Sequence, residues 1–219
     1  MNRLLITLAL TTLTVVSFGQ KTKLVDLKKI EKVANTETYD QLFKRFLEND
    51  TTLTIEDYCI LYYGEAYKSS YKPKARHDSI RVLNSYLSLD IDSIDFEKVL
   101  DYTKLILDEF PFNLDQIFIT AITYNELGKE DLSVLWFYKY DKLLMSILNS
   151  GNGKSRKTAF IVTKVPDEYT VIDALGLIPK GQGLIRKGRK LYDALYLHEN
   201  DFGINSLYFD INLFFYHNR

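Results

Sequence analysis

The segment Gly151-Asn-Gly-Lys-Ser155 is the part of the sequence closest to a known chemical motif, the phosphate-binding loop. That loop needs a further glycine five residues before Gly153, where this chain has Leu148. It also needs a strand before it and a helix after it, because the first amides of the helix bind the phosphate. Here the residue pattern changes from helix to strand. The segment is therefore interpreted as a turn.

Neither a metal site nor an activated thiol is indicated by the sequence. The histidines, His77, His198 and His217, are far apart, and no His-x-x-x-His spacing or Cys/His cluster occurs. Cys59, the single cysteine, lies in an apolar and aromatic stretch with no histidine near it in sequence. This setting is typical of a small buried residue rather than a nucleophile. We expect no cofactor, no metal and no internal disulfide.

Three carboxylates could form an acid/base pair if the fold brought them together. Asp193 lies in a predicted strand on the same face as several leucines, where a buried carboxylate is costly unless it is paired. One interpretation is a tuned acid that acts with Asp210 or Glu168 as a hydrolase of an envelope or dietary glycan. The other is a structural carboxylate that pairs with Arg189 or Lys190, or accepts from the backbone. The structural interpretation is favoured, because buried charges are usually paired.

Tyrosines at helical spacing could form a recognition surface. Tyr63, Tyr67 and Tyr71 are four residues apart and line one stripe of a helix, which could stack on a sugar ring or grip a peptide. Tyr196 and Tyr208 share one face of a predicted hairpin. The alternative is that the stripe is core, but sixteen tyrosines in one chain are too many for all to be fully buried. We predict these five as ligand-contact residues.

Helical periodicity dominates the chain up to about residue 150. A capping box at Thr54 and Asp57 predicts the start of one helix, and Pro73 marks a point that this helix cannot pass. Further helices are predicted over Thr36–Glu48, Ala75–Leu87, Phe96–Glu109, Leu114–Leu127 and Asp131–Leu148.

Two of these helices fit a tetratricopeptide-like hairpin. With Pro111 at the closing proline of one repeat, the signature positions of the next fall on Ala121, Tyr124, Ser133, Phe137 and Tyr140. The repeat prefers small, aromatic, small, aromatic and small residues there, and only the last residue is unsuitable. We predict one such hairpin but no array, because no second good copy is found.

After residue 150 the apolar pattern changes to period 2, which predicts strands. They are expected over Ala159–Thr163, Tyr169–Leu175, Lys190–His198 and Asn205–Tyr216. Pairing Leu197 with Leu207 around a loop at Asn200–Ile204 puts the leucines on one face and the tyrosines on the other. The predicted fold class is α+β, with N-terminal helical hairpins followed by a small antiparallel sheet of about four strands. Residues 20–150 would form the helical region and 151–219 the sheet region, packed as one compact unit.

The first 19 residues have the layout of a secretory signal peptide. Arg3 precedes an apolar run, and small residues at Ser17 and Gly19 predict cleavage after Gly19. The run is shorter than the about 20 apolar residues that span a bilayer, and no cysteine follows it for lipid attachment. We expect an exported protein of the periplasm or cell exterior, neither a lipoprotein nor membrane-spanning after cleavage. The near balance of 28 Lys+Arg and 29 Asp+Glu excludes nucleic acid as an expected partner.

Several motifs together resemble a family of exported Bacteroidota proteins, domain of unknown function 4919. The N-terminal motifs are Asp50-Thr-Thr-Leu-Thr54, Leu61-Tyr-Tyr-Gly64 and Tyr71-Lys-Pro73. The later ones are Asp167-Glu-Tyr169, Gln182, Tyr192-Asp193 and Tyr208-Phe209. The resemblance covers most of the chain after the signal segment. It implies an exported protein of this size with helices first and a sheet last, and it brings no activity, substrate or catalytic residue.

These observations favour a non-enzymatic binding or protein-interaction module of the cell envelope. The repeat-like hairpin and the tyrosine stripe would form the contact surface, with the sheet as scaffold. An envelope protein or a glycan is the partner that this surface suits. The alternative is the glycan hydrolase with an Asp/Glu pair.

Overall fold

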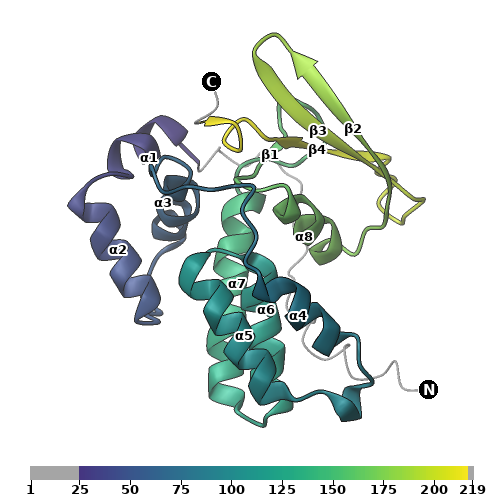
Figure 1. The fold of residues 1–219 in the computed structure, drawn as a ribbon. Coiled ribbons are helices and arrows are strands. Elements are labelled where there is room, and N and C mark those ends of the chain that lie inside the picture. The colour runs from purple at the N-terminus through teal and green to yellow at the C-terminus, as the bar shows by residue number, and fades with distance from the viewer. Residues whose placement is uncertain (1–24, 217–219) are drawn as a thin grey trace.

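The computed structural model describes residues 25–216 and confirms the α+β fold class, with helices first and a four-stranded sheet last (Figure 1). The predicted signal segment 1–19 and His217 lie outside the described residues. The helices are α1 (Leu27–Val33), α2 (Glu37–Leu47), α3 (Ile55–Glu65), α4 (Ser79–Leu87), a 3-10 turn η1 (Ile91–Ser93), α5 (Phe96–Glu109), α6 (Leu114–Glu126), α7 (Glu130–Leu148) and α8 (Pro166–Ala174). The strands are β1 (Phe160–Ile161), β2 (Pro179–Lys187), β3 (Lys190–Leu197) and β4 (Ser206–Asp210). Among these helices, none is both long and apolar enough to cross a membrane.

Local start signals explain where several helices begin. The predicted capping box of α3 is present: the Thr54 hydroxyl accepts from the Asp57 amide at 3.2 Å, and the Asp57 carboxylate accepts from the Thr54 amide at 2.9 Å. Asn113 caps α6 in the same way, accepting from the Gln116 amide. α1, which the sequence pattern did not reveal, begins at Asp26, whose carboxylate accepts from two backbone amides.

Helices α5, α6 and α7 pack side by side as successive antiparallel hairpins, close to the ranges predicted from the sequence (Figure 1). Ala121 and Ser133 are buried at the contact between α6 and α7, where small residues let the helices approach. Phe118 packs its ring against Phe137 and Tyr140. The helical hairpin is therefore confirmed, while its likeness to a tetratricopeptide repeat stays a prediction.

The four strands form one mixed sheet in the order β1-β4-β3-β2. β4 is antiparallel to β3 and parallel to β1, so the sheet is not wholly antiparallel as predicted. The parallel pair arises because α8 and the β2–β3 hairpin connect β1 to the later strands. β2 and β3 meet in a tight turn at Gly188, whose φ of 61° is readily adopted only by glycine. β4, the last strand in sequence, thus lies inside the sheet.

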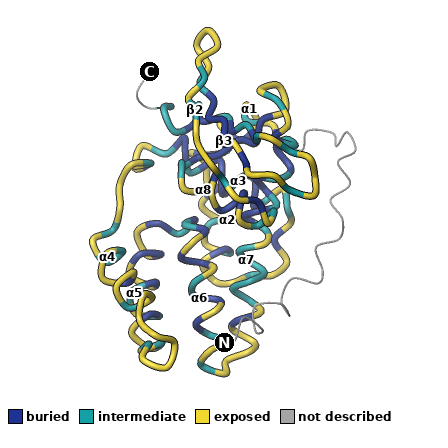
Figure 2. Tube along the Cα trace, turned by 90° about the vertical axis from the view of Figure 1, so that its right-hand side faces the viewer, coloured by how far each residue is buried: buried dark blue, intermediate teal, exposed yellow. Residues whose placement is uncertain are grey.

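Three details of the strand prediction are corrected by the structure. Residues 169–174 of the predicted strand Tyr169–Leu175 belong to α8, because Pro166 at its first turn followed by two acidic residues is a helix start that outweighs the β-branched content. β2 was missed because its sequence is rich in glycine and lysine; it is an edge strand and largely exposed (Figure 2). The β3–β4 register pairs Leu195 with Leu207, two residues from the predicted pairing.

A loop built on one side chain sets this register. The Asn200 amide nitrogen donates to the carbonyls of His198 and Ile204, and its oxygen accepts from the amides of Phe202 and Ile204. The connection between the strands is therefore longer than the predicted loop. A shift of two residues keeps every side chain on its face, so the apolar alternation could not distinguish the two registers.

One large core joins the helices to the sheet. It runs from Val25 in the N-terminal segment to Leu213 after the last strand, and it contains many aromatic rings. α7 connects the part of this core that lies among the helices with the part that lies against the sheet, since it contacts both α3 and β1. A second, smaller core lies under α4 and α5 around Leu83 and Ile106. Phe110 of this smaller core lines the two clefts described below.

Candidate functional site

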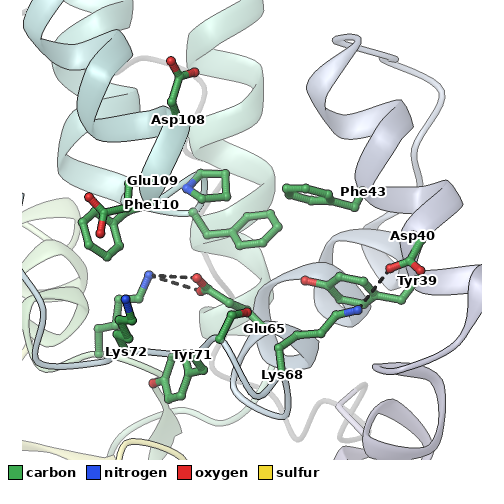
Figure 3. A pocket seen from close by; sticks show the side chains of 14 residues that line it. Tyr39, Asp40, Phe43, Glu65, Lys68, Tyr71, Lys72, Asp108, Glu109 and Phe110 are labelled. Atoms are coloured by element: carbon green, nitrogen blue, oxygen red, sulfur yellow. Dashed lines mark hydrogen bonds and ion pairs between the residues drawn. The ribbon is translucent and has the colours of Figure 1, made fainter.

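Two clefts flank the segment that connects α3 to α4. The first, with a volume of about 470 Å³, lies between α2, α3 and the end of α5 (Figure 3). The second, about 690 Å³, lies between the connecting segment, α6 and the start of α8. Lys72, Phe110 and Lys164 line both clefts. The clefts therefore adjoin, with these three side chains at their common border.

Ion pairs occupy the first cleft. Lys164 Nζ lies 3.1 Å from the Glu65 carboxylate, and both side chains are less than one-fifth exposed. Lys68 bonds Asp40 at 3.1 Å and also lies 4.2 Å from the centroid of the Tyr39 ring (Figure 3). Lys164 and Lys68 are therefore already neutralised by neighbouring carboxylates and offer no unpaired charge to a ligand in the first cleft.

The basic residues of the connecting segment, which line the second cleft, differ from Lys164 and Lys68 in exposure and pairing. Lys72, Lys74 and Arg76 are exposed, and within residues 25–216 none of them makes an ion pair. Lys74 lies 5.8 Å from the centroid of the Phe214 ring, which is a weak cation–π contact. The connecting segment thus presents three basic side chains along one rim of the cleft, where they can meet an anionic group.

The lining of the second cleft also contains aromatic rings and buried polar groups. Phe110, Phe118 and Phe214 line the cleft together with Gln116. Gln116 is only 5% exposed, and its side-chain oxygen accepts no hydrogen bond from any described residue. A buried acceptor without a donor is costly, so this oxygen is a natural partner for a donor that enters the cleft.

Asp167, in the first turn of α8, also lines the second cleft. It is 3% exposed and accepts a 2.5 Å hydrogen bond from the Tyr62 hydroxyl. That hydroxyl in turn accepts from the Thr163 amide at 3.2 Å. Burial raises the pKa of Asp167 to about 7, against the opposing effects of Lys164 and the Tyr62 hydrogen bond. At neutral pH the carboxyl is therefore close to half protonated.

A second acidic pair lies where α8 packs against the sheet. Glu168 is fully buried, and neither of its oxygens receives a hydrogen bond from an N–H or hydroxyl of the described residues. Its neighbour is Asp193 of β3, and two carboxyls can bond only when one of them keeps a proton. Burial first, and Asp193 second, raise the pKa of Glu168 to about 9. The proton is therefore retained at neutral pH.

Asp193 is buried as the sequence predicted, but its partner is not the one expected. Gln182 of β2 donates to the Asp193 carboxylate at 2.9 Å, and the Tyr169 hydroxyl donates to the Gln182 oxygen at 3.0 Å. No ion pair with Arg189 or Lys190 forms, because both basic residues are exposed at the β2–β3 turn. Neither Glu168 nor Asp193 lines either of the two clefts.

The predicted tyrosine stripe lies in the interior. Tyr63 is 0% exposed, and its hydroxyl reaches the carbonyls of Ser146 and Ile161, each at 3.1 Å. Tyr67 and Tyr71 are each 8% exposed. The Tyr67 ring packs edge-on against Tyr216, and the Tyr71 hydroxyl donates to the Thr163 carbonyl. These three residues tie α3 and the following segment to the rest of the core, and this burial argues against their forming an exposed contact surface.

The remaining predicted residues are on the sheet. Tyr196 is 44% exposed and lies over Gly183, where an added Cβ would be 2.7 Å from its hydroxyl. Tyr208 is half-buried and pairs with Ala194. Asp210 accepts from the backbone and side-chain amides of Asn212. None of these residues lines the second cleft.

Sequence reasoning missed the cleft residues themselves. The run Lys72-Pro-Lys-Ala-Arg76 between two predicted helices was a usable signal, because three cations in five residues beside a proline stand out in a chain of balanced charge. Gln116 and Asp167 gave no comparable signal. Among residues 25–216, no group of three or more His, Cys, Asp or Glu side chains is arranged to hold a metal ion.

Comparison with known proteins gives one match. The model of a protein family described as a domain of unknown function (DUF4919) matches residues 26–217. No curated protein and no solved structure matches the chain.

Proposed function

We propose that this chain, which belongs to the DUF4919 family, is a non-enzymatic binding protein that accepts its ligand in the second cleft. The observation that carries the proposal is the composition of the cleft lining: three cations without ion pairs among the described residues line it together with aromatic rings and a buried amide. Small-molecule sites combine an apolar lining with a few polar groups in this way. The contact surface is therefore assigned to the cleft, rather than to the tyrosine stripe.

The compartment in which this protein acts is also part of the proposal. The predicted signal segment over residues 1–19 supports export to the periplasm or cell exterior, where the ligand would be a component of the envelope or of the medium. We propose a ligand of that origin, with no role for nucleic acid.

Binding is favoured over glycan hydrolysis by the position of the carboxyl groups. Hydrolases of this class place two carboxyls across a cleft, roughly 5–9.5 Å apart, so that they flank the bond that breaks. Glu168 and Asp193 instead share a closed contact between α8 and β3, and Asp210 is engaged by Asn212. Neither cleft is lined by any of these three groups. Two other carboxyls, Asp115 and Asp167, do line the second cleft, but each is already held by a hydroxyl of the protein, that of Thr170 and that of Tyr62.

The experiment is ligand capture from a small-molecule extract of the envelope, followed by native mass spectrometry. Ala75 is exposed and lines the second cleft, so Ala75→Trp fills the cleft without disturbing the core. The matched control is Asn125→Trp, on an exposed position of α6 outside both clefts. Molecules retained by the wild type and the control but lost from Ala75→Trp are the expected result. If the three proteins retain the same molecules, or none, the cleft is not a binding site.

A further inference from the structure

We infer that the ligand of the second cleft is an acidic saccharide, a sugar unit that carries a carboxylate beside its hydroxyl groups. The inference rests on the proposed function and specifies its ligand. Three independent features of the cleft support it: its unpaired cations, its buried acceptors and its aromatic wall.

The positive charge of the cleft lining favours a ligand that carries an anionic group. Four cations line the cleft, from Lys72, Lys74, Arg76 and Lys164, against two carboxylates. Lys164 is neutralised by Glu65, which leaves the three on the rim. Arginine and lysine bind carboxylates through charge-assisted hydrogen bonds, and Arg76 can do so with two parallel bonds. The acidic group of the ligand would therefore lie at this rim.

The hydrogen-bond acceptors of the cleft lining favour a ligand that also carries hydroxyl donors. The Gln116 oxygen is buried without a donor, and the carboxyls of Asp115 and Asp167 also line the cleft. Asp115 already accepts from the Thr170 hydroxyl at 3.0 Å, which orients its carboxylate. A ligand made only of anionic oxygens, such as sulfate, has no donor for these groups and would be repelled by them. A sugar supplies several hydroxyls that donate to them.

The aromatic wall suits the apolar face of a sugar ring. Phe118 is 38% exposed, a large value for a phenylalanine, and it lines the cleft, as do Phe110 and Phe214. Flat rings of this kind pack against the C–H face of a pyranose, while the hydroxyl edge is left free for hydrogen bonds. The volume of about 690 Å³ lies within the range of small-molecule sites, about 300–1,000 Å³.

An acidic peptide end is the strongest competing ligand, because it too has carboxylates and N–H donors. It fits the cleft less well in one respect. A free amino terminus would need an ionised carboxylate, and the more buried of the two cleft carboxylates, Asp167, already bonds the Tyr62 hydroxyl and has a pKa that burial raises to about 7. Neutral hydroxyl donors match this environment better than an ammonium group does.

Isothermal titration calorimetry with three probes of equal length tests the inference. The probes are trigalacturonate, the neutral trisaccharide maltotriose and the acidic peptide tri-glutamate. We expect trigalacturonate to bind at least about tenfold more tightly than either of the others, because only it satisfies the cations and the acceptors together. Its affinity should also fall as salt is added, since the rim cations are exposed.

Two variants show whether binding uses the cleft. Gln116→Leu removes the buried acceptor, and Arg76→Gln removes an exposed cation with no contact to the core. Each should weaken trigalacturonate binding about tenfold or more. Lys104→Gln, which removes an exposed cation of α5 outside both clefts, should leave the affinity unchanged.

Three outcomes would overturn the inference: no binding of trigalacturonate, equal or tighter binding of tri-glutamate, or affinities that do not respond to Arg76→Gln. These outcomes are separable from failure of the proposed function. If Ala75→Trp still abolishes capture of another class of molecule from the extract, the cleft binds a ligand and only its assignment as an acidic saccharide is wrong.

Discussion

The hydroxyl of Tyr62 holds α3 to the start of α8, and its removal is the sharpest test of how the core is built. Tyr62 is 0% exposed and comes from α3, whereas its partner Asp167 is 105 residues later in the sequence. Tyr62→Phe keeps the ring and deletes only the oxygen. Two hydrogen bonds are lost, the 2.5 Å bond to the Asp167 carboxyl and the 3.2 Å bond from the Thr163 amide.

The size of the loss can be worked from these two bonds. A bond to a carboxylate contributes about 1.5–3 kcal/mol and a neutral bond about 0.5–1.5 kcal/mol, and the Thr163 amide is left buried without a partner. We therefore expect the free energy of unfolding to fall by about 2–4 kcal/mol. For a domain of this length, each kcal/mol lowers Tm by about 2–4 °C, so the fall in Tm should be roughly 4–16 °C.

The chain supplies a matched control on the same helix. Tyr58 is 1% exposed, but its hydroxyl makes no hydrogen bond to another described residue, so Tyr58→Phe should change the free energy of unfolding by less than about 0.5 kcal/mol. Urea denaturation followed by the fluorescence of Trp136, the single tryptophan, measures both variants. Equal losses in the two variants, or a Tyr62→Phe loss below 0.5 kcal/mol, would refute the assignment of stability to this hydroxyl.

Three further predictions concern other buried groups. Glu168 has a pKa of about 9 in the folded protein and an ordinary value of 4.5, so the folded state binds more protons and stability falls as pH rises between these values. Glu168→Gln should remove this fall and raise the free energy of unfolding by on the order of 1–3 kcal/mol at pH 8, measured by urea denaturation, with no gain at pH 4.5. Gly64→Ala would place a Cβ 2.6 Å from Tyr39 Cε2 and should lower the free energy of unfolding by about 1–3 kcal/mol, checked by the same denaturation. Cys59 is 4% exposed and burial raises the pKa of its thiol, so labelling by iodoacetamide should be at least ~100-fold slower than in the urea-unfolded chain.

Each of these has its own control. Glu199→Gln, at an exposed position, should leave the pH dependence of the free energy of unfolding unchanged. If the free energy of unfolding of Glu168→Gln varies with pH as that of the wild type does, Glu168 does not retain its proton in the folded protein. Gly181→Ala brings its Cβ only to 3.7 Å from Tyr196 and should cost less than about 0.5 kcal/mol. If both glycine variants are equally stable, the contact between Gly64 of α3 and Tyr39 of α2 has room for an added methyl group. Rapid labelling of Cys59 in the native protein would mean that α3 opens readily.

Those parts of the fold whose signals are local could be predicted from the sequence. The capping box at Thr54 and the breaks at Pro111 and Gly128 define helices through contacts within a few residues, and α3, α5, α6 and α7 follow them closely. Where local signals conflict, prediction failed. In 169–175 the β-branched residues favoured a strand, but the proline and acidic residues before them, together with burial of Val171 and Ile172, decided for a helix.

The cleft depends on contacts that no local pattern contains. Its lining comes from the segment after α3, from α6, from the start of α8 and from Phe214 near the C-terminus. The tyrosine stripe had the spacing of a helix face, but spacing does not distinguish a face turned to solvent from one turned to the core. Asp193 was expected to be buried because its neighbours on the strand are apolar, whereas its partner Gln182 lies in β2, a strand that the pattern did not reveal.

The position of β4 has a consequence for the order in which the molecule can assemble. Because this strand fills the gap between β1 and β3, the polypeptide from about residue 160 to 205 has no complete sheet to join until residues 206–210 arrive. A chain in which this segment has not yet paired would leave the facing edges of β1 and β3 without partners. The complete sheet would therefore form only when residues 206–210 insert between β1 and β3 and pair with both strands.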